Sequence, residues 1–137
     1  MKYKIFTFLI FAISLSNIAS AQQSEKEREL SRVLTITANS LSKQMPMTLD
    51  TDTRLDSVAT TGNQFIYNNT LVNYTAEQMD ANQLDKFLKE NVLNAICPNK
   101  DMEGFIELGV VMVYRYLGKN GNFITELSLD TKTCKTT

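Results

Sequence analysis

The chain has 137 residues, with 14 basic and 15 acidic side chains, and it contains neither histidine nor tryptophan. A chain of this length can form one domain with a sizeable core, but not two. The absence of histidine excludes Ser-His triads, Cys-His pairs and histidine metal sites. We therefore expect no enzyme activity, no cofactor and no bound metal.

The N-terminus has the pattern of a secretory signal peptide. Lys2 and Lys4 precede an apolar run of about a dozen residues, which is too short for a membrane-spanning helix, and the small residues "ASA" end at Ala21. We expect residues 1–21 to be a signal peptide cleaved after Ala21. Residues 22–137 would then form a single α+β domain that is periplasmic or secreted. A retained membrane anchor is the alternative, but no stop-transfer pattern follows the apolar run, so we expect no membrane insertion after cleavage.

Cleavage would remove two lysines, which leaves 12 basic against 15 acidic residues. Nucleic-acid binding requires a concentrated basic surface, so this mild acidity argues against a nucleic-acid partner.

The chain has two cysteines, Cys97 and Cys134. In an oxidising compartment such a pair is typical of a disulfide. A reactive thiol is the alternative, but there is no CxxC spacing and no histidine that could lower a thiol pKa. We expect the two residues to form a structural disulfide that joins the end of a helix to the end of the sheet.

Three segments have the apolar spacing of amphipathic helices. The first extends from residue 25 to 43, the second lies between Thr75 and Pro98, and the third covers residues 100–108 and ends at Gly109. These apolar stripes, of which the second includes Phe87 and Leu88, favour core packing over a cofactor site.

Two pairs of strand-like segments lie between the helices. Residues 54–60 and 65–74 flank the turn "TTGN", and residues 110–117 and 122–129 flank "GKNG". This order predicts an α+β fold with helices packed on one face of a largely antiparallel four-stranded sheet made of two hairpins. Alternation places Tyr114 and Tyr116 on one face of their strand.

The segment "DTDTRLDS", residues 50–57, has acidic residues at alternate positions. A calcium loop of the EF-hand type is excluded, because Arg54 and Leu55 occupy the positions of a ligand and of the glycine. In a strand, Asp52, Arg54 and Asp56 share one face, which favours a structural ion-pair cluster. A carboxylate pair for acid and base catalysis is the alternative, and it would need a cleft.

The segments "MPMTLDTDTRLDSV", "YNNTLVNY" and "GVVMVYRYLGKNGNFITELSLDTKTC" resemble those of small exported proteins from Gram-negative bacteria, some of which are described as quorum-sensing-regulated virulence factors. The resemblance covers most of the chain after residue 21. It implies a periplasmic or secreted bacterial α+β protein and transfers no active-site residues.

Three functions are compatible with these patterns. The first is a protein-interaction module, such as an assembly accessory, inhibitor or virulence-associated factor, that binds another protein through a sheet edge or an exposed face. The second is a carrier of a small ligand held beneath the tyrosines Tyr67, Tyr74, Tyr114 and Tyr116. The third is a hydrolase without histidine that uses Asp52, Arg54 and Asp56. The candidate interaction or structural residues are Asp52, Arg54, Asp56, Tyr114 and Tyr116.

Overall fold

The computed structural model describes residues 14–136, and the side chains of residues 25–134. Most of the predicted signal peptide, residues 1–13, lies outside this part. The helices are α1 (Ser14–Ser42), α2 (Ala81–Ile96) and α3 (Glu103–Leu108), with short 3-10 helices η1 (Ala76–Gln78), η2 (Lys100–Met102) and η3 (Thr131–Thr136). The strands are β1 (Met47–Thr48), β2 (Thr53–Thr61), β3 (Gln64–Leu71), β4 (Val111–Gly118) and β5 (Phe123–Asp130).

The five strands form one sheet in the order β1-β2-β3-β4-β5. The pairs β1–β2, β2–β3 and β4–β5 are antiparallel, whereas β3 and β4 at the centre run parallel. Parallel neighbours need a long crossover, and η1, α2, η2 and α3 supply it between β3 and β4.

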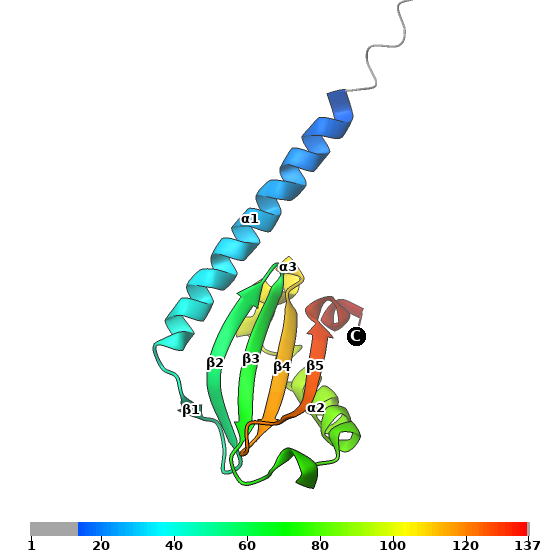
Figure 1. Ribbon diagram of the computed structural model, residues 1–137. Helices are drawn as coiled ribbons and strands as arrows, with labels where there is room; N and C mark the ends of the chain where they lie inside the picture. The colour runs from blue at the N-terminus through cyan, green and yellow to red at the C-terminus, as the bar shows by residue number, and fades with distance from the viewer. Residues whose placement is uncertain (1–13, 137) are drawn as a thin grey trace, which may run out of the picture.

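The helices cover one face of this sheet and leave the other face free of helices. Figure 1 shows α2 and α3 behind the strands, with α1 running along β2 and its N-terminal end extending beyond the sheet. Leu34 of α1 and Ile96 of α2 contact the same buried cluster as Phe65 of β3 and Met112 of β4. The second cluster joins Leu88 of α2 to Leu71, Tyr116, Ile124, Leu127 and Leu129.

Local sequence explains where the shorter helices begin and end. The Asp80 carboxylate accepts hydrogen bonds from the backbone N–H groups of Asn82 and Gln83, which caps α2. Gly109 ends α3 with a φ of +67°, in the left-handed region that favours glycine. The disulfide between Cys97 and Cys134 joins the end of α2 to η3, which follows β5.

The α+β class, the disulfide and both hairpins were predicted correctly, but the sheet was not. It has five strands and is mixed, because the two hairpins join through a parallel pair and because Met47–Thr48 adds a short edge strand. Two residues of strand carry too little alternation to be recognised in a sequence. Helix α1 was predicted to begin at Glu25, but it begins at Ser14 and continues without a break to Ser42.

Candidate functional site

A polar row crosses the helix-free face of the sheet. Register places Ser57, Asn68, Arg115 and Glu126 side by side on four adjacent strands. The Asn68 amide donates to the Ser57 hydroxyl (3.1 Å), Arg115 donates to the Asn68 oxygen (3.4 Å), and the Arg115 Nε donates to Glu126 (2.7 Å). This row links the four longer strands through their side chains.

The pair formed by Arg54 and Asp56 lies on the same face. The Arg54 Nε donates to one Asp56 oxygen, and the Thr70 hydroxyl donates to the other at 2.5 Å. The side chains of Arg54 and Asp56 are 45% and 30% exposed, so water screens the ion pair. Both carboxylate oxygens of Asp56 already have donors, which makes a structural role more suitable than acid and base work.

Asp52 does not join this pair, contrary to the expected same-face cluster. It precedes β2, in a turn where the Asp50 carboxylate accepts hydrogen bonds from the backbone N–H groups of Asp52 and Thr53, each at 2.8 Å. The Asp52 carboxylate instead accepts a hydrogen bond from the Asn73 amide at 2.7 Å. These backbone bonds at Asp50 lower the pKa of its carboxyl group. The alternation of strand side chains does not extend to Asp52, because β2 begins at the next residue, Thr53.

The tyrosines of the candidate set lie on the opposite, helix-covered face. Tyr114 of β4 stacks on Tyr67 of β3, with ring centroids 5.1 Å apart and an interplanar angle of 6°. Tyr116 is buried beside them in the second core cluster. The structure thus separates the predicted candidates into two groups on opposite faces, and it adds Tyr67 as the partner of Tyr114.

Burial changes the acidity of these tyrosines. It raises the pKa of Tyr67 to about 12, and it also raises the pKa of Tyr114 and of Tyr116, because the phenolate would lose hydration. Proximity to Tyr67 and Tyr116 raises the pKa of Tyr114 further, and the Asp50 carboxylate has the same effect on Tyr116. All three side chains are therefore neutral at physiological pH and suited to packing and hydrogen bonding.

The stacked pair remains partly exposed although helices cover this face. Tyr67 and Tyr114 are both half-buried, and in the described part of the chain no buried side-chain oxygen or nitrogen lacks a partner. Helix α1 packs on β2 and α2 on β5, and residues of both helices belong to the core clusters against which the two rings pack. Each of the two helices also has a large apolar side chain in solvent, with Ile36 of α1 55% exposed and Phe87 of α2 61% exposed.

We use the name tyrosine surface for Tyr67, Tyr114, Ile36 and Phe87. Sequence reasoning identified Tyr67 and Tyr114 among four tyrosines but missed Ile36 and Phe87. Ile36 lies two residues from both Leu34 and Ala38, so it is on the side of α1 opposite the buried stripe, whereas Phe87 lies next to Leu88 at the edge of the stripe of α2. Phe87 had been included in that stripe, although it points to solvent.

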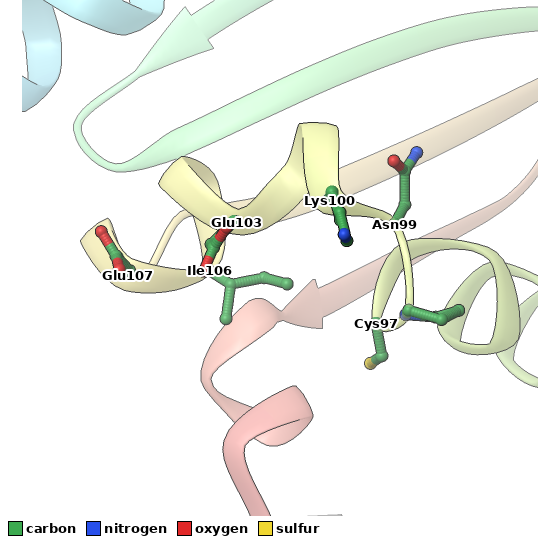
Figure 2. Close-up of a pocket in the computed structure, with 7 residues that line it drawn as sticks. Cys97, Asn99, Lys100, Glu103, Ile106 and Glu107 are labelled. Carbon is green, nitrogen blue, oxygen red and sulfur yellow. The ribbon is translucent and has the colours of Figure 1, made fainter.

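Several clefts occur elsewhere in the described structure, and none of them is lined by the tyrosine surface. Figure 2 shows one of about 380 Å³ beside the disulfide, where Cys97 and Asn99 follow α2 while Glu103, Ile106 and Glu107 belong to α3. The Cys97 sulfur is bonded to the Cys134 sulfur, so Cys97 offers no free thiol in this cleft. A second cleft, of about 560 Å³, lies between residues 26–30 of α1 and the end of α3, with Leu30, Leu108 and Lys132 in its lining.

Neither cleft is lined by Asp52 or Asp56, as the hydrolase alternative would require. Among the described residues there is also no group of three or more acidic or cysteine side chains arranged to hold a metal ion. In the same part of the chain, no helix is long and apolar enough to cross a membrane.

A mixed sheet that helices cover on one face and that a disulfide joins to α2 defines a small α+β domain. The family model described as "Putative quorum-sensing-regulated virulence factor" matches residues 23–135, and the chain belongs to this family. This confirms the resemblance found in the sequence. No curated protein matches the chain.

Three solved structures share the fold. A "putative secreted protein" from Pseudomonas aeruginosa is 22% identical with a TM-score of 0.67, over 80% of this chain and 96% of that protein. A pilotin of the Vibrio vulnificus type 2 secretion system is 15% identical with a TM-score of 0.66, over 81% and 96%. The type II secretion system pilotin of Vibrio cholerae is 16% identical with a TM-score of 0.62, over 82% and 98%.

Proposed function

We propose that this protein is an exported protein-interaction module that acts as an assembly accessory in the bacterial cell envelope, and that it binds its partner through the tyrosine surface. The observation that carries the proposal is the exposure of the large apolar side chains Ile36 and Phe87 on the helices that cover the face with the half-buried pair Tyr67 and Tyr114. Aromatic side chains are enriched at protein interfaces, and the fully buried centre of an interface is poor in charge. The fold that the chain shares with pilotins of two type II secretion systems supports an accessory role.

A small-ligand carrier is less well supported by the same geometry. Tyr67 and Tyr114 stack on each other, so each ring already covers one face of the other. Small-ligand sites are enclosed cavities that bury most of the ligand. The clefts described above are lined by other residues, in particular by those around α3 and by residues 26–30 of α1.

The test is site-specific photocrosslinking in the native host, with the photoreactive residue placed at Phe87 or at Phe123. The two phenylalanines form a matched pair because they are 61% and 59% exposed. Phe123 belongs to β5 and pairs with Leu117, on the helix-free side of the sheet. We expect a discrete crosslink to a different protein from position 87 and no crosslink to a different protein from position 123.

Substitution then tests the energetic contribution of the surface. Phe87→Ala should weaken binding of that partner by about 1–3 kcal/mol if Phe87 is at the centre of the interface, whereas Phe123→Ala should leave binding unchanged. Equal crosslinking from both positions, or equal binding by both variants, would contradict the assignment of the tyrosine surface.

A further inference from the structure

Strand β5 forms one edge of the sheet, and its outer side has backbone groups without partners in the described structure. The Thr131 N–H donates to the Val110 oxygen at 3.2 Å, which fixes the phase of the β4–β5 ladder. Hydrogen-bonded pairs alternate along an antiparallel ladder, so Leu127 and Leu129 bond to β4. The N–H and C=O groups of Glu126 and Ser128 therefore point away from the sheet, and no hydrogen bond engages them among the described residues.

This accessible edge is short at both ends. The Asp130 carbonyl accepts a hydrogen bond from the Thr133 hydroxyl at 2.8 Å, so it is no longer available to a new strand. Towards the start of the strand, an irregularity opposite Tyr116 and Leu117 breaks the register. The N–H and C=O groups of Glu126 and Ser128 are arranged symmetrically about Leu127.

Side chains select the occupant of this edge. Glu126 and Ser128 are both exposed on the helix-free face. The Ser128 hydroxyl has no partner among the described residues. The Glu126 carboxylate accepts from the Arg115 Nε at 2.7 Å and keeps further lone pairs. The edge thus presents one free donor and one acceptor with spare capacity, two residues apart.

We propose that β5 pairs antiparallel with β5 of a second copy of this chain, with the two-fold axis at Leu127. In this register Glu126 faces Ser128 of the second copy, twice, and the four outward backbone groups of each copy are satisfied. Each Ser128 hydroxyl then donates to a Glu126 carboxylate across the axis.

Other self-pairings of these groups bring carboxylates together. An axis at Glu126 places the two Glu126 side chains opposite each other, and an axis at Ser128 places Glu126 opposite Asp130. Like charges directly opposite each other destabilise an antiparallel pair. The register about Leu127 avoids both juxtapositions, which is why a second copy fits this edge.

The pairing is independent of the tyrosine surface, because it uses the edge of the sheet rather than the residues of that surface. It joins two five-stranded sheets into one continuous sheet and removes an open edge, which would otherwise be free to pair with unrelated strands. Closed two-fold assembly of this kind buries the same patch on both copies.

The experiment is sedimentation velocity of the protein comprising residues 22–137, over a wide range of concentration, with Ser128→Pro and Ser128→Thr as matched variants. Proline removes the outward N–H but no ladder bond, whereas threonine keeps both the N–H and the hydroxyl. We expect a reversible dimer for the wild type and Ser128→Thr, and a dissociation constant about 30-fold higher for Ser128→Pro. Far-UV circular dichroism checks that each variant is folded.

Amide hydrogen exchange of the wild type provides a measurement that needs no variant. The amides of Glu126 and Ser128 should exchange fast in the monomer and become protected as the concentration rises, while those of Leu127 and Leu129 are protected throughout. A monomer at all concentrations, an undiminished dimer of folded Ser128→Pro, or concentration-independent exchange at Glu126 and Ser128 would each overturn the proposal.

Discussion

Raising the pH should destabilise this protein through the tyrosines on the helix-covered face. Tyr67 is neutral below pH 10 in both the folded and the unfolded chain, so it contributes no pH dependence there. In the unfolded chain its phenol ionises near pH 10. Its folded pKa is raised to about 12, because burial would deprive the phenolate of hydration.

The sign and size of the effect follow from this difference. Since the folded pKa is higher, the unfolded state releases its proton first, and the free energy of unfolding falls as the pH rises from about 10 to about 12. Two pKa units correspond to ~2.7 kcal/mol for Tyr67 alone. The raised pKa of Tyr114 adds a loss in the same direction.

The assay is ultraviolet titration of tyrosinate absorbance in the folded and the guanidinium-unfolded protein, with Tyr67→Phe as the control. The Tyr67 hydroxyl has no hydrogen-bond partner among the described residues, so Tyr67→Phe should fold normally. The variant should lack one group that titrates at high pH. The reasoning is refuted if all tyrosines of the folded protein ionise near pH 10, or if Tyr67→Phe removes a group that titrates normally.

Four further outcomes can be checked by denaturant unfolding or mass spectrometry. Gly118→Ala should lower the free energy of unfolding by about 1–3 kcal/mol, because a Cβ at this position would lie 2.4 Å from the Ala76 backbone nitrogen of η1. Gly104→Ala should raise the free energy of unfolding by about 0.5–1 kcal/mol, because a Cβ at this position of α3 would meet no atom within 4 Å. Cys97→Ala should lower it by about 4 kcal/mol, since the disulfide closes a separation of 37 residues, and reduction of the wild type should have the same effect. Arg54→Ala should lower it by about 1 kcal/mol or less, given 45% exposure, and a loss above ~3 kcal/mol would contradict a screened ion pair. The exported protein should begin at Gln22, and an intact Met1 in exported material would contradict cleavage after Ala21.

Local patterns predicted much of the secondary structure. The stripe between Thr75 and Pro98 became α2, and Gly109 ends α3 as expected, because capping and helix termination depend on neighbours within a few residues. The hairpin turn "GKNG" likewise joins two paired strands. The parallel pairing of β3 with β4, which joins the two hairpins, was not predicted. Local patterns do not show to which end of the sheet the segment between the hairpins returns the chain.

The candidate residues divide in the same way. Alternation correctly separated Tyr114 and Tyr116 from the other face of their strand, because successive side chains of a strand point in opposite directions. It could not show that Tyr67 stacks on Tyr114, since that contact depends on the parallel register of β3 and β4. Nor could it place Asp52, because the Asp50 side chain turns the backbone just before β2 begins.

By itself, the sequence determined the α+β class, the cysteine pair, the family, and a side-chain inventory without histidine, since these depend on composition and on short-range spacing. Only the tertiary structure decided which face of the sheet the helices leave free, that Ile36 and Phe87 remain in solvent, and that Glu126 and Ser128 direct their backbone groups outward. The physical reason is that burial and edge exposure are properties of what packs beside a residue, and those neighbours come from distant parts of the chain.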